Sequence, residues 1–190
     1  MGAVSTLNRG AMALDFWFDY SCPYAYLASL VAERAARLRG EPLVLRPMLL
    51  GGVFRARGTA QNLMGELSAA KATHNFADMH RWAKLLGAPL NVPAEHPLRT
   101  VEALRATLAT GVDPAVVRGF YRAYWVENAP ISAPAVLERV LREAGHDPGP
   151  VLERASSPAI KDELRARTDE ALALGIFGAP AWIVEGQLYW

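Results

Sequence analysis

The single cysteine of this chain, Cys22, lies in a sequence context that could make it chemically active. It follows residues 13–20, a short run rich in aromatic side chains that is typical of a β-strand. It directly precedes Pro23, and the apolar residues beyond Pro23 recur at helical spacing. Because proline is favoured in the first turn of a helix, we expect Cys22 to lie where a strand ends and a helix begins.

This position determines what the sulfur of Cys22 could do. The positive end of the helix dipole would point at the sulfur and lower the pKa of the thiol. Such a thiol is either a nucleophile or a hydrogen-bond partner for another thiolate. The alternative is a buried, unreactive cysteine, since free cysteine often serves as a small core residue. The strand-to-helix context favours the functional interpretation.

Composition and charge limit the other function classes. The 190 residues are 52% hydrophobic, which is enough for one well-packed domain or one domain with an insertion. The formal net charge is +1 with Lys and Arg scattered, so we predict no nucleic-acid partner. A lone cysteine permits neither an internal disulfide nor a thiolate zinc site, and we predict no metal. No apolar stretch approaches the about 20 residues that span a bilayer, so we predict a cytoplasmic protein without membrane contact.

The first half of the chain predicts a βαβ unit. Residues 42–48 form a second strand candidate, and the strand–helix–strand order places the two strands parallel. A turn-like stretch follows at 51–58. Helical patterns then continue for about a hundred residues, with apolar faces at 76–86, 98–108, 116–125, 136–141 and 151–155.

The second half supplies helix starts and a closing hairpin. Asp113, Ser132 and Ser157 each precede a proline-containing first turn and are predicted to cap helices. Strand signal returns at 181–184, and a tight turn at 185–186 leads into a pairing strand that begins at 188.

This order, with a cysteine after the first strand and a proline before the third, is similar to the thioredoxin fold with a helical insertion. The segment 18–28 resembles the opening of the 2-hydroxychromene-2-carboxylate isomerases and the kappa-class glutathione transferases, which have a DsbA-like thioredoxin fold. Four further stretches agree with that family in order along the chain, at 50–54, 71–83, 121–125 and 175–180.

The resemblance implies an α/β protein of two parts. A thioredoxin-like domain would comprise 13–47 and 156–190, and an inserted helical domain would comprise 48–155. Residues 1–12 are expected to be a disordered extension or an expression remnant, because they lack the apolar centre of a signal peptide. Relatives continue past a Gly-Gln-Asp-Arg-like loop into a closing helix. We therefore expect that C-terminal helix to be missing here and one apolar sheet face to be exposed.

The activity implied by the resemblance is that of a glutathione-dependent isomerase acting on an unsaturated aromatic carboxylic acid. In that family glutathione is the cofactor, and its thiolate adds to the substrate and leaves after a bond has rotated, without a metal. The resemblance further implies a homodimer and a role in aromatic catabolism.

The resemblance also assigns site residues. Cys22 takes the catalytic position, where the family usually has the serine that hydrogen-bonds the glutathione sulfur. The residues implied to bind glutathione are Pro23, Asn62, Lys71, Ala179 and Pro180, the last two as a cis-proline loop. Those implied to line the substrate pocket are Tyr24, His74 and Trp125.

Taken without the resemblance, several of these residues have simpler interpretations. Lys71 is typical of a solvated charge on a helix, and Pro180 could merely lead a strand. Trp82, Tyr121 and Trp125 sit at the spacing of an apolar helix face, which more often packs in a core.

Cysteine in place of serine leaves a second function open. The thiol could form a mixed disulfide with glutathione, as in a monothiol oxidoreductase or transferase related to DsbA. Ala25 stands where the DsbA enzymes keep their resolving cysteine, which excludes efficient dithiol exchange. A third possibility is an inactive binding remnant that has lost glutathione affinity. Arg99, where relatives often carry asparagine, either retunes the carboxylate site or is neutral.

Overall fold

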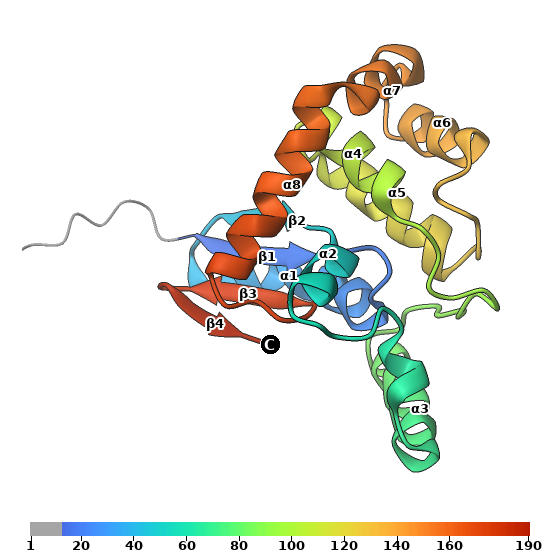
Figure 1. Ribbon diagram of the computed structural model, residues 1–190, viewed down its shortest axis with the longest axis vertical. Helices are drawn as coiled ribbons and strands as arrows, with labels where there is room; N and C mark the ends of the chain where they lie inside the picture. The colour runs from blue at the N-terminus through green and yellow to red at the C-terminus, as the bar shows by residue number, and fades with distance from the viewer. Residues whose placement is uncertain (1–12) are drawn as a thin grey trace, which may run out of the picture.

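The computed structural model describes residues 13–190, and for residues 63 and 64 it describes the backbone alone. The predictions for residues 1–12 lie outside this range. The fold centres on a four-stranded sheet of order β2-β1-β3-β4 (Figure 1). The strands are β1 (Leu14–Phe18), β2 (Leu43–Pro47), β3 (Ala181–Val184) and β4 (Gln187–Tyr189).

The predicted βαβ unit is confirmed. Helix α1 (Pro23–Arg39) connects β1 to β2, and the two strands pair in parallel from Leu14 opposite Leu43 to Phe18 opposite Pro47. Gly40 ends the helix with φ of 67°, a left-handed conformation that glycine adopts without a Cβ clash. The closing hairpin is also confirmed, since β3 pairs antiparallel with both β1 and β4.

The turn predicted at 51–58 is wrong for 51–56, which belong to helix α2 (Leu50–Ala56), and is confirmed only at 57–58. Two glycines in sequence argue against a helix on propensity alone. Packing overrides propensity here, because Leu50, Val53 and Phe54 bury one face at helical spacing. Gly52 also allows close approach to α8, where a Cβ would lie only 3.1 Å from Cγ2 of Thr168.

The inserted region is helical as predicted. Asp113 accepts a hydrogen bond from the N–H of Ala115, and Ser157 accepts one from the N–H of Ile160, so both predicted caps are confirmed. The cap predicted at Ser132 is wrong by one residue, because Ala133 precedes the first helical turn. The remaining elements are η1 (Leu63–Glu66), α3 (Ala69–Leu85), α4 (Val101–Ala109), α5 (Pro114–Trp125), α6 (Pro134–Glu143), α7 (Pro148–Ser156) and α8 (Pro158–Ala173).

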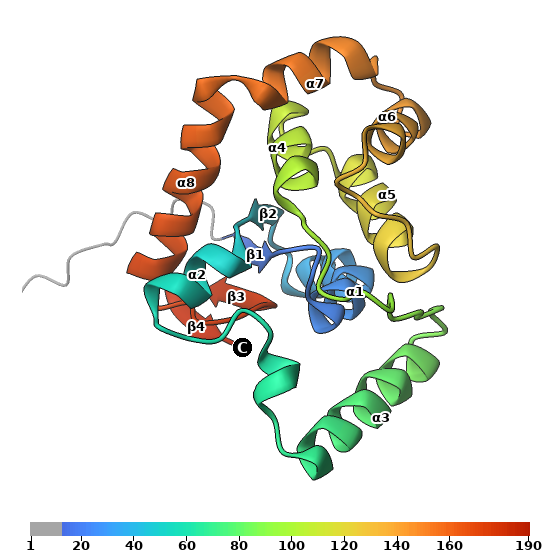
Figure 2. The same ribbon diagram turned by 45° about the vertical axis from the view of Figure 1, so that its right-hand side comes forward.

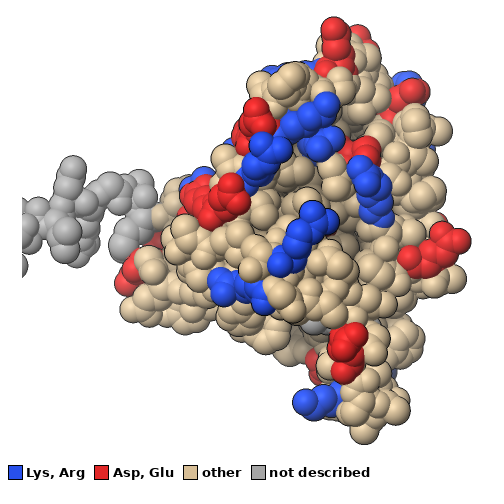
Figure 3. Space-filling view, in the orientation of Figure 1, with Lys and Arg blue, Asp and Glu red and all other residues tan. Residues whose placement is uncertain are grey.

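These helices are distributed unevenly around the sheet. Figures 1 and 2 show α4 to α7 grouped at one end of the molecule, with α8 returning from that group to the sheet. Helix α3 projects from the opposite end, beyond the first turn of α1 (Figure 2). Lys and Arg lie among Asp and Glu on the face seen in Figure 3, so neither charge sign covers it alone.

An aromatic core joins the sheet to α5. Phe18 of β1 lies 5.9 Å from Tyr121 between ring centroids, and Tyr20 lies 5.0 Å from the same ring. All three side chains are buried. The loop that carries Cys22 therefore starts from a buried aromatic cluster.

Part of the predicted apolar sheet surface is exposed beside α1. A hollow of about 350 Å³ lies there, lined by Leu14, Ala35, Arg39, Trp182, Val184 and Tyr189. It is formed by the sheet and by α1, and Cys22 is not among its lining residues.

Candidate thiol site

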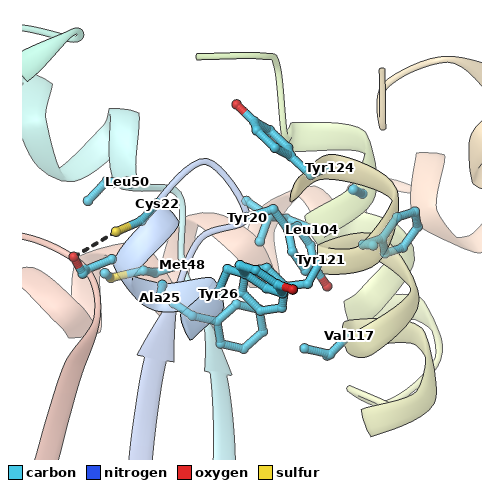
Figure 4. Close-up of a cluster of buried hydrophobic side chains, with 14 of the residues drawn as sticks. Tyr20, Cys22, Ala25, Tyr26, Met48, Leu50, Leu104, Val117, Tyr121 and Tyr124 are labelled. Atoms are coloured by element: carbon cyan, nitrogen blue, oxygen red, sulfur yellow. Dashed lines mark hydrogen bonds between the residues drawn. The ribbon is translucent and has the colours of Figure 1, made fainter. Parts of the chain in front are cut away.

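Cys22 occupies the predicted junction and makes a contact with a distant segment. It is the N-cap residue of α1, with extended φ and ψ of −95° and 117°, and Pro23 follows in the first turn. Its thiol Sγ donates a hydrogen bond to the backbone oxygen of Ala179 over 3.0 Å (dashed line in Figure 4). The peptide bond between Ala179 and Pro180 is cis. The structure therefore brings four of the predicted site residues together, namely Cys22, Pro23, Ala179 and Pro180.

The predicted lowering of the thiol pKa is wrong. Burial raises the pKa of Cys22 to about 12, although the backbone N–H groups of Ala25 and Tyr24 act in the opposite direction. The negative charge of Asp19 raises it further. Only 8% of the Cys22 residue is exposed, so the loss of hydration outweighs the favourable helix end. At neutral pH the side chain is a thiol that donates a hydrogen bond.

A buried carboxylate supports this loop, and the sequence analysis missed it. Asp19 is 1% exposed and accepts hydrogen bonds from the N–H of Leu50 at 2.8 Å and from the N–H of Ser21 at 3.1 Å. The hydroxyl of Ser21 donates to the same carboxylate at 3.2 Å. An acidic residue at the end of an apolar strand, just before the only cysteine, was the available signal.

Tyr24 connects the first turn of α1 to α3. Its hydroxyl donates to Oδ2 of Asp78 at 3.2 Å and lies 3.4 Å from the backbone oxygen of Asn75. Burial and the charge of Asp78 raise the pKa of Tyr24 to about 12, so the phenol stays neutral. Lys71 and His74 are exposed on the same helix, seven and four residues before Asp78, and so share its side of α3.

Asn62 and Arg99 are both exposed. Asn62 precedes η1, and its side-chain oxygen accepts from the N–H of Gly65 at 3.4 Å. The guanidinium of Arg99 is paired with the carboxylate of Glu102 at 2.8 Å. Arg99 is therefore already neutralised by a neighbour on its own segment.

The placement of Trp125 in a substrate pocket is contradicted. The residue is fully buried, and its indole N–H donates to the backbone oxygen of Tyr20 at 2.8 Å. Tyr121 is buried as well, as expected for a core aromatic. Trp82 departs from that expectation, because 49% of it is exposed on α3.

Two exposed aromatic residues flank the proline loop instead. Phe177 and Trp190 are 47% and 71% exposed, and their ring centroids lie 5.2 Å apart. Gly178 permits this arrangement, because a Cβ there would lie 2.8 Å from Nε1 of Trp190. The pair presents an apolar surface beside the proline loop, because Phe177 lies three residues before Pro180 and Trp190 approaches Gly178. The signal in the sequence was the glycine between an aromatic residue and Ala179-Pro180.

Among the described residues, no three His, Cys, Asp or Glu side chains gather into a possible metal site. Within 13–190, no helix has both the length and the apolar character needed to cross a bilayer.

Residues 13–190 match the family model described as the DSBA-like thioredoxin domain. The chain belongs to this family. The predicted thioredoxin-like fold with a helical insertion is therefore confirmed, and the contact between Cys22 and Ala179 joins two segments of that DsbA-like domain.

Curated relatives of this DsbA-like protein fall into two groups. A 2-hydroxychromene-2-carboxylate isomerase from Sphingobium xenophagum is 29% identical over 179 residues, covering 93% of this chain and 91% of its own. A glutathione S-transferase kappa 1 from Rattus norvegicus is 26% identical over 191 residues, covering 93% and 83%. The family resemblance drawn from the sequence is thereby confirmed.

Solved structures extend this comparison. A structure of SeMet 2-hydroxychromene-2-carboxylate isomerase has a TM-score of 0.82 at 25% identity, covering 94% of this chain and 88% of its own. The cytosolic disulfide reductase DsbM from Pseudomonas aeruginosa, solved with GSH, has a TM-score of 0.64 at 20% identity, covering 93% and 88%. The second structure shares the fold of this DsbA-like protein.

Proposed function

We propose that this protein is a glutathione-dependent isomerase of an unsaturated aromatic carboxylic acid of the 2-hydroxychromene-2-carboxylate type. The observation that carries the proposal is the hydrogen bond from the Cys22 thiol to the backbone oxygen of Ala179. It places a protonated donor against the loop expected to pair with the glutathione backbone. The relatives named as isomerases, at 29% and 25% identity, support the reaction class.

The residues present fit glutathione as a cofactor. Bound glutathione would supply the thiolate that adds to the unsaturated acid and leaves again. The product would therefore be an isomer of the substrate, and glutathione would be regenerated. Cys22 would turn its S–H from Ala179 to that thiolate, and a hydrogen bond to a charged acceptor is stronger than one to a neutral carbonyl. The oxygen of Ala179 would then be free to accept from a peptide N–H of the tripeptide.

Two sets of exposed residues would select the substrate. Lys71, His74 and Asn62 are polar and accessible, and we assign them to the carboxylates of glutathione and the aromatic acid. Phe177 and Trp190 offer an apolar surface beside the same loop for an aromatic ring.

A monothiol oxidoreductase or transferase is the second candidate, because Cys22 could itself form a mixed disulfide with glutathione. The burial of the sulfur and its raised pKa disfavour it, since the thiolate is the form that attacks a disulfide. A protein that does neither reaction is the third possibility.

The deciding experiment follows the absorbance of 2-hydroxychromene-2-carboxylate with and without glutathione. We expect conversion that requires glutathione but does not consume it. C22S is expected to retain activity and C22A to lose most of it, because serine keeps a donor and alanine does not. Mixed-disulfide formation by the folded protein without any conversion would overturn the proposal in favour of the second candidate.

We also propose that the protein is cytoplasmic and forms a homodimer, as the family resemblance implies. Sedimentation equilibrium of the purified protein tests whether it is a homodimer, and a monomer at micromolar concentration would contradict this proposal.

A further inference from the structure

We propose that Asp19 is the positioning residue of the thiol site: its buried carboxylate fixes the loop that carries Cys22 against α2 and makes Cys22 meet its ligand as a hydrogen-bond donor rather than as a nucleophile. The inference rests on the proposed function for the ligand that Cys22 meets. The test below uses no substrate, so the two proposals can fail separately.

The contacts of Asp19 show how it fixes the loop. One carboxylate oxygen accepts from both the N–H and the hydroxyl of Ser21, directly before Cys22. The other accepts from the N–H of Leu50, the first residue of α2. The backbone oxygen of Asp19 also accepts from the N–H of Cys22 at 3.3 Å. Three hydrogen bonds thus converge on one carboxylate. The two from Ser21 are local, and the one from Leu50 joins segments that are 31 residues apart.

The partners of Asp19 favour its ionised form. The N–H groups of Ser21 and Leu50 can only donate, so both bonds lower the pKa of Asp19. Burial acts in the opposite direction and raises the pKa of Asp19 overall. A proton on the oxygen that faces Leu50 would leave the buried N–H of Leu50 without its acceptor.

Among the described residues, no titratable neighbour of Cys22 favours its thiolate form. Asp19 is the charged neighbour that raises the pKa of the thiol. The other titratable neighbours are Tyr24 of α1 and Tyr121 and Tyr124 of α5, and their hydroxyls are neutral because burial raises each pKa. A thiolate at Cys22 would therefore face a carboxylate and no compensating cation among these neighbours, which disfavours its formation.

The test exploits the single cysteine. Protein labelled with 13C at the cysteine Cβ gives one resonance, whose chemical shift reports the thiolate fraction whatever the accessibility of the sulfur. In D19N the neutral amide keeps an oxygen for the N–H of Leu50 but removes the charge. We expect the thiolate fraction at about pH 10 to rise by about tenfold, which corresponds to about one pKa unit.

D15N is the matched control, because Asp15 lies on β1, the strand that leads into Asp19, and is paired with Arg46 at 3.1 Å. We expect its cysteine resonance to titrate as in the unmodified protein. If D19N folds and its cysteine resonance titrates at the same pH as in the unmodified protein, the proposal is overturned. A purely structural role of Asp19 would leave the thiol equilibrium unchanged.

A second measurement covers the case in which D19N does not fold. The side-chain carboxyl carbon of Asp19 can be followed in the unmodified protein between about pH 6 and about pH 10, where an ordinary aspartate is ionised. We expect the chemical shift of an ionised carboxylate throughout. The shift of a neutral carboxyl at about pH 8 would overturn the proposal.

Discussion

Trp125 donates its indole N–H to the backbone oxygen of Tyr20, two residues before Cys22. The bond is fully buried and connects the last turn of α5 to the start of the thiol loop. Trp125, which was predicted to line the substrate pocket, therefore supports the loop of Cys22 from the protein interior.

Replacing Trp125 by phenylalanine should destabilise the protein. The substitution leaves a buried carbonyl without its donor, which costs about 1–3 kcal/mol in the free energy of unfolding. Urea denaturation measures this change. W82F, on the half-exposed side of α3, is the control and should stay within about 0.5 kcal/mol. Equal effects of the two substitutions would contradict the importance of the bond.

Cys22 should be replaceable by serine but not by alanine. The Cys22 donor would stabilise the thiolate of bound glutathione, and a hydrogen bond to a charged group contributes about 1.5–3 kcal/mol. We expect C22A to lose about 10- to 100-fold in the rate of isomerisation because less of the bound glutathione is ionised, and C22S to lose much less. Circular dichroism must show that both variants fold. Full activity in C22A would contradict the donor role.

The stability of the protein should fall in alkali partly because of Cys22. Its pKa in the fold is about 12 against an ordinary value of 9.0, so the folded state holds the proton more tightly. The stabilisation from this difference is fully present below pH 9.0 and is lost as the pH rises toward about 12. C22S lacks this titration, so its free energy of unfolding should decline less steeply over that interval. Parallel declines would contradict the raised pKa.

Removing the hydroxyl of Tyr24 should alter substrate binding more than folding. Y24F loses the contact with Asp78, which contributes about 0.5–1.5 kcal/mol to stability, and frees α3 from the first turn of α1. Because Lys71 and His74 lie on α3, we expect KM for the aromatic acid to rise several-fold with kcat little changed. L85A, at an exposed position of the same helix, is the control. An unchanged KM in Y24F would contradict a contribution of α3 to substrate binding.

The pair of Phe177 and Trp190 should contribute to recognition of the aromatic ring. We expect W190A to raise KM for the aromatic acid but not KM for glutathione. Trp190 is largely exposed, so its removal should change stability little. Y189A is the control, because Tyr189 is also exposed but lines the hollow on the sheet beside α1. Equal effects of the two variants on KM would contradict the assignment.

The sequence predicted the sheet and the position of Cys22 because these depend on local signals. An aromatic strand, a proline after the cysteine and a tight turn before the last strand each act over a few residues. The helix α2 was missed because its stability comes from packing against α8, whereas its own glycines argue for a turn.

The candidate site was harder to predict, because its properties arise from burial. The helix end beside Cys22 suggested a lowered pKa, and only the folded structure shows that the sulfur is enclosed. The position of Asp19 before Cys22 was visible in the sequence, but its role was not, because its hydrogen-bond partners lie in two separate segments. Trp125 fits an apolar helix face equally well in a pocket or in a core, and the sequence does not separate the two.

The first turn of α2 has a consequence for insertions and deletions. The N–H of Leu49 donates to the hydroxyl of Thr168 on α8 at 3.0 Å, and the next N–H, that of Leu50, donates to Asp19. One residue added between Pro47 and Leu49 would lengthen the connection from β2 to α2 and displace both donors from their acceptors together. The length of this short connection is therefore as constrained as the identity of the residues that it joins.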